Sequence, residues 1–293
     1  MDSWENSSET VLNFGEYRAT MSTMQSDVHI VNDRKGTQSL SRGLAILSAF
    51  SYDRRELSVR ELAAQLGISR PTAYRLAKTL EQHGFLQLDP SNKTYGVGLT
   101  AFAVGQLFLP SSFSDVVDQL LEELRGATTH TVHAAVLDGS SLVMIAAKES
   151  RNLSRIVAHI GQRFTWHATA AGKAFLASLS NAEVVQLIHE SGLPRMASRT
   201  ITDLNDLLAD LELVRARGYA TATDEFAEGL HSIGMLVQGP KSVAPYTLAI
   251  SMPSGLSQTP EESERLVTHL RRAAGQFATI IAQYSPFVGS RRY

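Results

Sequence analysis

Residues 57–84 read LSVRELAAQLGISRPTAYRLAKTLEQHG, and this stretch decides the fold of the N-terminal part of the chain. Ser58 and Glu61 have the spacing of a capping box, which predicts that a helix begins after this serine. Gly67 predicts the end of the helix, because glycine tolerates the left-handed conformation that follows a C-cap. A first short helix is therefore expected between Ser58 and Gly67.

A second helix is predicted after a single intervening residue. Ser69 can cap it, and Pro71 lies in its first turn, where the missing N–H of proline costs nothing. Gly84 predicts its end. Two helices joined by so short a turn match the helix-turn-helix plan, in which the second helix enters the major groove of DNA. The outward positions of this helix are predicted to be Arg70, Thr72, Tyr74, Arg75, Lys78 and Thr79.

A hairpin is predicted directly after the two helices. Residues 85–88 and 94–97 favour extended structure, and residues 89–93 between them are turn formers. Lys93 lies at the tip, where a wing would contact the DNA backbone or the minor groove. The pattern predicts a winged helix-turn-helix; the alternative is an amphipathic helix pair with a solvated basic face. The predicted DNA-binding residues are Arg42, Ser58, Ser69, Arg70, Pro71, Thr72, Tyr74, Arg75, Lys78, Lys93 and Tyr95.

Charge is unevenly distributed along the 293 residues, whose formal net charge is −2. Residues 34–100 contain ten basic and five acidic side chains, and the remainder is mildly acidic. A basic module on an acidic body indicates a polyanionic partner for that module. The chain has no cysteine, which excludes disulfides, thiolate metal sites and a cysteine nucleophile. No apolar run approaches the ~20 residues that span a membrane, and no secretory signal is visible, so a cytoplasmic protein without membrane contact is expected.

The segments flanking residues 57–84 predict the domain organisation. Leu40, Leu44, Leu47 and Phe50 recur at helical spacing and predict one buried helix face. Residues 99–109 predict an apolar helix, which Pro110 interrupts. The expected organisation is a disordered tail at residues 1–36, a DNA-binding domain at 37–98, a linker helix at 99–113, a second domain at 114–285 and a tail at 286–293.

The second domain alternates predicted strands and helices. Strands are expected at residues 131–136 and 142–147, around the hairpin signal Asp138-Gly139, and at 155–159, 219–223, 233–237 and 246–252. Helices are expected at residues 114–125, with Gly126 as the stop, and at 169–179, 181–190, 203–217 and 259–283. Strand pairs with interspersed helices predict an α+β domain with an antiparallel sheet.

Together these stretches resemble the isocitrate lyase regulator (IclR) family of bacterial transcription factors, over about residues 38–285. The matching stretches are residues 39–47, 57–64, 67–76, 83–86, 95–99, 167–176 (HATAAGKAFL), 217–219, 224–229 and 249–251. The resemblance implies a winged N-terminal domain, a linker helix used in dimerisation and a GAF-like C-terminal α/β domain that binds a small-molecule effector. It also implies binding to palindromic operator DNA as a homodimer or a dimer of dimers, in repression or activation.

The resemblance also implies where an effector binds. In similar proteins the effector, often a carboxylate, lies against the loop entering the helix that here begins Ala170-Ala171-Gly172, where backbone N–H groups attract anions. Where relatives often have an acid, this chain has Ala222, with Asp224 as the nearest substitute. The effector is expected to be a small organic acid of more than two or three carbons, such as an aromatic carboxylate. The predicted effector-binding residues are Met144, Phe164, Trp166, Ala170, Ala171, Gly172, Asp224, Ser232, Met235 and Ser251, of which the two methionines and two aromatics have ordinary core packing as an alternative.

Enzymatic and metal sites have weaker support. The segment 229–234 resembles a nucleophile elbow but has one residue too many before Ser232. His130, His133, His159 and His167 lack the helical spacing of a zinc site. The sequence therefore predicts no catalytic residue, no metal and no cofactor, and a regulator of a metabolic, catabolic operon. A C-terminal domain that mediates oligomerisation or protein interaction without a ligand is the alternative.

Overall fold

The computed structural model describes residues 37–52, 54–138, 141–152, 156–240, 243–255 and 259–284. Within these ranges the chain forms two compact units that divide between Leu109 and Pro110. The predicted tails at residues 1–36 and 286–293 lie outside the described residues. Among the helices that are described, none combines the length and the apolar composition needed to cross a membrane.

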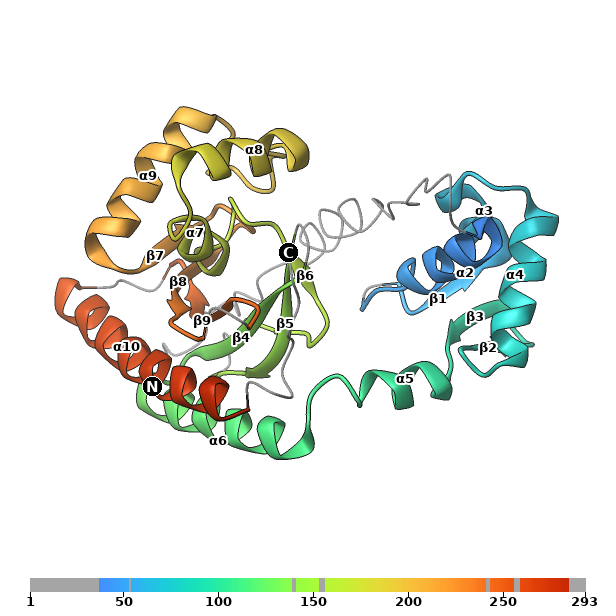
Figure 1. Ribbon diagram of the computed structural model, residues 1–293, viewed down its shortest axis with the longest axis horizontal. Helices are drawn as coiled ribbons and strands as arrows, with labels where there is room; N and C mark the ends of the chain where they lie inside the picture. The colour runs from blue at the N-terminus through green and yellow to red at the C-terminus, as the bar shows by residue number, and fades with distance from the viewer. Residues whose placement is uncertain are drawn as a thin grey trace, which may run out of the picture. The chain divides into compact units, whose positions relative to one another are not determined.

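The N-terminal unit is a helix-turn-helix followed by a hairpin (Figure 1). Its elements in chain order are α2 (Gln38–Ser48), β1 (Glu56–Ser58), α3 (Val59–Leu66), α4 (Arg70–Gln82), β2 (Leu86–Asp89), β3 (Thr94–Val97) and α5 (Leu99–Gly105). The three strands form an antiparallel sheet in the order β1-β3-β2. Its small core contains Ile46, Leu57, Leu62, Leu86 and Tyr95, all at most 2% exposed.

The predicted helix signals at the turn are confirmed. The Ser58 hydroxyl accepts the N–H of Glu61, and the Glu61 carboxylate accepts the N–H of Ser58 at 2.8 Å, which completes the capping box. Gly67 follows α3 in the left-handed region with φ +62°. The Ser69 hydroxyl caps α4 by accepting the N–H of Thr72. These local bonds fix how α4 leaves the turn.

Two features of this unit differ from the predictions. Strand β1 was not predicted; Leu57 lies in it and pairs with Tyr95 of β3, so three strands rather than two form the sheet. On α2 the predicted inward face is wrong at its start, because Leu40 and Leu44 are 62% and 55% exposed. The buried face instead contains Ala45, Ile46 and Ala49. The helix is apolar on two sides, and spacing alone cannot tell which of them meets a core.

The exit from the hairpin is a close backbone crossing. A Cβ atom on Gly98 would lie 2.2 Å from the carbonyl oxygen of Gly84, so only glycine fits at this position. The N–H of Gly98 donates to Phe85 O at 2.8 Å, and the N–H of Thr100 donates to Gly84 O at 3.0 Å. The first turn of α5 is therefore bonded directly to the segment that ends α4. Helix α5 itself ends at Gly105 rather than at the predicted residue 109.

The C-terminal unit is a six-stranded antiparallel sheet with helices on both faces (Figure 1). The strands are β4 (Thr131–Asp138), β5 (Ser141–Lys148), β6 (Arg163–Phe164), β7 (Ala220–Thr223), β8 (Leu230–Val237) and β9 (Tyr246–Pro253). Their order across the sheet is β6-β5-β4-β9-β8-β7. The helices are α6 (Ser111–Thr128), α7 (Ala170–Leu176), α8 (Asn181–Ser191), α9 (Leu204–Arg217) and α10 (Pro260–Tyr284). This confirms the predicted α+β class with an antiparallel sheet.

The two faces of the sheet have different cores. Helices α6 and α10 cover one face, where the rings of Phe113, Tyr246 and Phe277 lie 5.6–6.4 Å apart. Helix α7 covers the other face and lies directly on β8, since a Cβ atom on Gly234 would be 2.6 Å from the backbone of Ala170 and Ala171. We call this second side the α7 face. Because side chains alternate along a strand, register decides which residues reach it.

Three boundaries in this unit correct the predictions. Helix α6 continues through Gly126 to Thr128, whose buried hydroxyl bonds to Leu124 O, and Thr129 ends the helix with φ +64°. Residues 111–113, predicted as linker, form the first turn of α6, and Phe113 is fully buried. Residues 156–159 are not a strand, whereas residue 155 lies outside the described residues.

Candidate functional site

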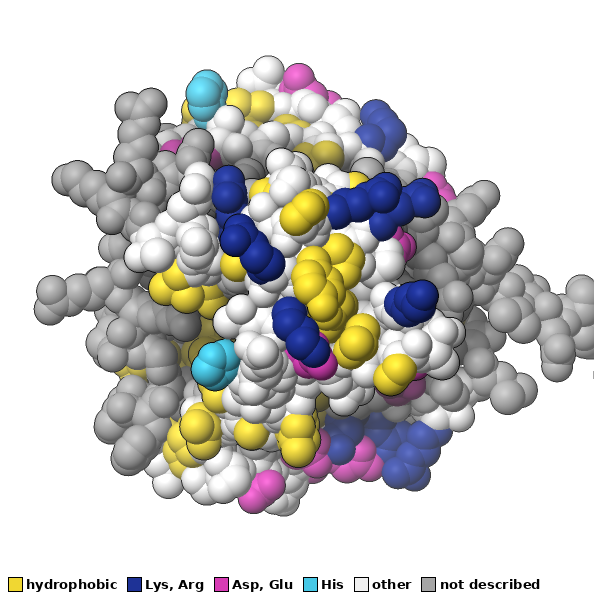
Figure 2. All heavy atoms as spheres, turned by 90° about the vertical axis from the view of Figure 1, so that its right-hand side faces the viewer, with side chains coloured by type: hydrophobic (Ala, Val, Ile, Leu, Met, Phe, Trp, Pro, Cys, Tyr) yellow, Lys and Arg dark blue, Asp and Glu magenta, His cyan; other side chains and the backbone are white. Residues whose placement is uncertain are grey.

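The outward side of α4 forms the first candidate site, and we call it the α4 surface. On the inner side Ala73 and Ala77 are fully buried, which anchors the helix to its own unit. Arg70, Tyr74 and Arg75 are exposed on the other side, and Thr72 and Lys78 are half-exposed. Figure 2 shows the face on which α4 lies, with Lys and Arg side chains spread around a strip of hydrophobic side chains and few acidic side chains among them. The prediction that this helix side is outward and basic is confirmed.

Not every cation on the α4 surface is free. The Lys78 ammonium lies 2.9 Å from the Glu81 carboxylate, and that contact raises the pKa of Lys78. The acid follows one turn later on the same helix and offsets part of the lysine's charge. Within the described ranges, no ion pair is formed by Arg70 or Arg75. The two arginines are therefore the cations best placed to contact an anionic partner.

Tyr95 corrects the predicted DNA-binding set. Its side chain is 1% exposed and packs in the core, because it pairs with Leu57 on one side and Leu88 on the other. Burial also raises the pKa of its hydroxyl. A residue in this position supports the wing from inside and cannot reach DNA with its side chain.

The remaining predicted residues lie around α4. Pro71 is exposed in the first turn, and the hydroxyls of Ser58 and Ser69 act as helix caps. Arg42 is half-exposed on α2. Lys93 is exposed in the wing loop with φ +55°. The loop is held by the carboxylate of Asp89, which accepts the N–H of Ser91 at 2.8 Å and the amide of Asn92 at 2.9 Å.

The second candidate site lies on the α7 face of the C-terminal sheet. Ser232 of β8 and Ser251 of β9 are register partners, so both hydroxyls point to this face as predicted. His133 of β4 lies beside them, with its Nε2 atom 3.2 Å from Ser251 Oγ. Its ring stacks on Phe164 at 6.2 Å between centroids, and Phe164 meets Phe226 edge-on at 5.6 Å. We call His133, Ser251, Phe164 and Phe226 the His133 cluster.

His133 is a site residue that the sequence did not identify. Its side chain retains some accessible surface, but its Nδ1 atom is buried with no hydrogen-bond partner among the described residues. Burial lowers the pKa of His133 to about 4, so the imidazole is neutral near pH 7. The strand register with Ala249 places it on the α7 face, and nothing in the local sequence predicts that register.

Met144 and Trp166 also lie on the α7 face. Met144 pairs with Ala135 across β5 and β4 and is 2% exposed. Trp166 packs against Phe175 with ring centroids 5.9 Å apart, and its Nε1 atom has no partner among the described residues. Both residues therefore face the side on which an effector wall is predicted, and ordinary core packing accounts equally for their burial.

The start of α7 offers fewer free donors than predicted. Ala170, Ala171 and Gly172 are buried, as a helix resting on the sheet requires. The N–H of Gly172 donates to the Thr169 hydroxyl at 3.1 Å and is therefore already used. Glycine is needed at residue 172 for packing, because a Cβ atom there would lie 2.2 Å from Trp166 O. The role of Gly172 is close approach rather than ligand binding through its N–H.

One predicted effector contact, Met235, is wrong, and a second, Asp224, holds a turn. Met235 pairs with Leu248, and both point to the α6 and α10 side, opposite to Ser232. A shift of one position along a strand moves a side chain to the other face. The Asp224 carboxylate accepts the N–H of Gly229 at 2.8 Å and the hydroxyl of Ser254 at 2.9 Å, while its backbone has φ +54°. Asp224 thus organises a turn.

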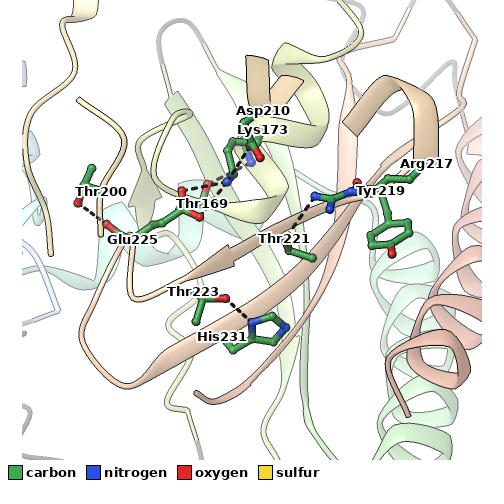
Figure 3. A network of polar contacts seen from close by, with 11 residues as sticks. Thr169, Lys173, Thr200, Asp210, Arg217, Tyr219, Thr221, Thr223, Glu225 and His231 are labelled. Carbon is green, nitrogen blue, oxygen red and sulfur yellow. Dashed lines mark hydrogen bonds and ion pairs between the residues drawn. The ribbon is translucent and has the colours of Figure 1, made fainter. Parts of the chain in front are cut away.

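Glu225, the neighbour of Asp224 in the sequence, belongs to a buried ion cluster (Figure 3). Lys173 of α7 is 1% exposed, and its Nζ atom lies 2.9 Å from both carboxylate oxygens of Glu225 and 3.0 Å from Asp210 of α9. Burial raises the pKa of Glu225. The Thr200 hydroxyl donates to Glu225 O at 2.6 Å. The cluster connects α7, α9 and the segment after β7. The signal that the sequence offers for it is a lysine placed among small and apolar residues, in AAGKAFL.

Among the residues that the structure describes, the α7 face has neither the groups of a hydrolase nor those of a metal centre. Ser232 lacks a histidine partner, because His231 points to the opposite face and bonds to Thr223 at 2.7 Å. Ser251 does contact His133, but none of the described acids orients that imidazole through Nδ1. Among the described residues no group of three or more potential ligands could hold a metal ion.

Comparison with known proteins finds matches to both units of the chain. Residues 112–279 match the family model described as "Bacterial transcriptional regulator IclR C-terminal", and residues 39–90 match "IclR helix-turn-helix domain". The chain is 35% identical over 203 residues to the transcriptional repressor IclR of Escherichia coli K12, covering 68% of this chain and 74% of the relative. It is 31% identical over 222 residues to the HTH-type transcriptional repressor AllR of Salmonella paratyphi A, covering 75% and 82%.

Solved structures share the fold. An IclR-type transcriptional regulator from Silicibacter sp. TM1040 matches with a TM-score of 0.73 and 25% identity, over 83% of this chain and 96% of that one. The inducer-binding domain of PobR from Acinetobacter, solved as a double mutant with 3-hydroxybenzoic acid, matches with a TM-score of 0.51 and 26% identity, over 56% of this chain and 96% of that one. The chain therefore shares its fold with both of these structures.

Proposed function

The chain belongs to the IclR family of bacterial transcriptional regulators, and from this premise we propose that it controls a metabolic, catabolic operon by binding operator DNA and responding to a small organic acid. Family membership makes it a regulator rather than an enzyme. The observation that supports DNA binding best is the α4 surface, where Arg70 and Arg75 project from a capped helix-turn-helix.

Helix α4 has the geometry that major-groove recognition needs. Its N-terminal end presents Arg70, Thr72 and Tyr74, and in this motif the first residues of the second helix face the base edges. Arginine can pair bidentately with guanine, whereas hydroxyl groups suit phosphates or single base contacts. Lys93 in the wing supplies a further cation for the backbone.

The exposed apolar side chains of the linker support a homodimer. Leu99, Phe102, Val104, Leu107 and Phe108 are between 51% and 82% exposed on α5 and the residues that follow it. So many large apolar groups exposed in one short segment indicate an interface, and a second copy of the chain is the partner that a palindromic operator requires. A dimer of two such dimers is compatible with the same arrangement.

The α7 face supports the effector part of the proposal. It brings Ser232, Ser251 and His133 together beside Phe164, which combines polar groups with an aromatic surface. Ligand sites have this composition: mostly apolar walls with a few convergent polar groups. The hydroxybenzoic acid bound by the PobR domain is a ligand of the same class, and an aromatic acid is the effector we expect here.

The test uses the full-length chain and the intergenic DNA next to its own gene. Fluorescence anisotropy over a salt series should show sequence-selective binding, with log K falling linearly as log salt rises. Adding aromatic acids should change the affinity for the operator fragment and leave binding to random DNA unchanged. Equal affinity for operator and random fragments at every salt concentration would refute the DNA-binding role. The alternative, a C-terminal domain without a ligand, predicts operator binding that no acid alters.

A further inference from the structure

The His133 cluster contains a polar group that the fold places on the α7 face without satisfying it. Ser251 bonds to Nε2 of the imidazole, but Nδ1 is buried and has no partner among the described residues. Three more polar atoms on or next to this face share that condition: Thr165 Oγ1, Trp166 Nε1 and Thr247 Oγ1. Buried polar atoms are nearly always hydrogen-bonded, so several orphans in one region indicate a ligand that satisfies them.

The surroundings of His133 show which charges act on it. Its strand neighbours Ala147 and Ala249 are apolar, and β6 contributes Phe164. Glu149 directly follows β5, and its carboxylate accepts the N–H of Ala158. From the side of α7, Lys173 is paired with Glu225 and Asp210. Burial alone lowers the pKa of His133, to about 4, which agrees with this absence of a charged neighbour among the described residues.

These observations bear on how the site accommodates an anion. The paired Lys173 supplies no free positive charge, and the N–H of Gly172 is occupied by Thr169. The imidazole of His133 is neutral in the empty site. It can become a cation when a carboxylate lies beside it, because the negative charge favours the protonated form. Phe164 and Phe226 add ring surfaces against which a flat apolar ligand can stack.

We propose, on the basis of the function given above, that His133 and Ser251 bind the carboxylate of an aromatic effector, and that His133 takes up one proton from the solvent as the carboxylate enters. The protonated ring donates its two N–H groups, one to Ser251 and one to the ligand oxygen. Effector affinity is then linked to pH: it rises as the pH falls towards the pKa that His133 has in the complex. His133 is thereby a specificity residue for acids over neutral analogues.

The experiment measures binding of benzoate, 3-hydroxybenzoate, 4-hydroxybenzoate and neutral benzamide to the full-length chain by calorimetry at pH 6.0 and pH 7.5. The acids are expected to bind about fivefold to tenfold tighter at pH 6.0, with a proton uptake that shows as a dependence of the heat on the buffer. Benzamide should show neither effect. His133→Asn should weaken acid binding at pH 6.0 and remove the pH dependence. His189→Asn, on the exposed side of α8, is the matched control and should behave as the parent chain.

Acid binding without proton uptake, or with the same pH dependence in His133→Asn, would overturn the proposal, as would failure of every acid in the panel to bind at millimolar concentration. Far-ultraviolet circular dichroism and operator binding of the variant show whether it folds, and His133→Gln provides a second substitution without a titrating group. The role of His133 and the proposed function can fail independently. If the operator fragment is bound and some other metabolite releases it, only the His133 assignment fails; if no operator is bound, the proposed function fails.

Discussion

The α4 surface and the α7 face are both sites for a partner, but they are built by different physics. The α4 surface lies on one helix, is exposed, and depends on caps that lie within a few residues of each other. The α7 face is assembled from β4, β5, β6, β8, β9 and the start of α7, and its serines Ser232 and Ser251 are buried. Substitutions on the first should therefore change binding and leave stability alone, whereas substitutions on the second should change stability as well.

The largest effect is expected from Lys173→Met on the α7 side. Removing one partner of a buried ion cluster leaves Glu225 and Asp210 without their cation, which costs about 3–5 kcal/mol. The free energy of unfolding should be measured with urea by circular dichroism. Lys148→Met removes an ion pair with the exposed Asp118 and should cost less than about 1 kcal/mol. Equal losses in both variants would remove the contrast between the two regions.

The pH dependence of stability also distinguishes the buried α7 face from the exposed α4 surface. His133 has a pKa of about 4 in the folded chain, below the ordinary value of 6.5, so the unfolded chain binds a proton that the folded chain excludes between these values. Its contribution is fully present above pH 6.5 and is lost as the pH falls, by about 2 kcal/mol at pH 5. Burial lowers the pKa of His130, His167 and His231 as well, in the same direction. Urea midpoints at pH 7.5 and pH 5 should therefore differ less for His133→Asn than for His189→Asn, and an identical difference would argue against a neutral buried His133.

On the exposed side, Arg75→Ala should weaken operator binding by about 1–3 kcal/mol if the guanidinium contacts a base, without changing stability or effector affinity. Anisotropy with the operator fragment at physiological salt measures the loss. Arg151→Ala is the control, because that side chain is 80% exposed on the C-terminal unit. Unaltered operator affinity in Arg75→Ala would contradict the placement of α4 in the groove.

The smallest effect is expected at Lys78. Its ammonium is already paired with Glu81, so Lys78→Ala should reduce the salt dependence of operator binding by less than the unit expected of a free phosphate contact. Glu81→Gln should have the opposite sign and strengthen binding slightly. The slope of log K against log salt distinguishes the two variants. A full unit lost in Lys78→Ala would mean that the pair opens on DNA.

The two regions also differ in how well a sequence predicts them. The capping box at Ser58, the left-handed Gly67 and the cap at Ser69 were predicted correctly because each signal involves neighbours in the chain. Tyr95 and Met235 were wrong because their direction depends on which residue of another strand they oppose. His133 was not identified for the same reason, since its contact with Ser251 joins residues 118 positions apart.

Local signals also failed where packing overrides them. Gly126 predicts a helix end, yet α6 continues to Thr128, which is buried and whose hydroxyl bonds to Leu124 O within the helix. The acid expected near Ala222 was assigned to Asp224, whereas the neighbouring Glu225 is the one paired with Lys173. Only the fold shows which of two adjacent carboxylates turns inward.

The crossing of Gly98 over Gly84 has a mechanical consequence. The start of α5 is joined to the end of α4 by two backbone hydrogen bonds and by a contact that leaves no room for a methyl group. The two helices are therefore expected to move as one rigid unit. In a dimer held together through α5, the distance between the two copies of α4 is then set by the angle at which the α5 helices cross. A rotation of a few degrees at the crossing of the α5 helices would move both copies of α4 away from their operator half-sites together, without any change inside either helix-turn-helix.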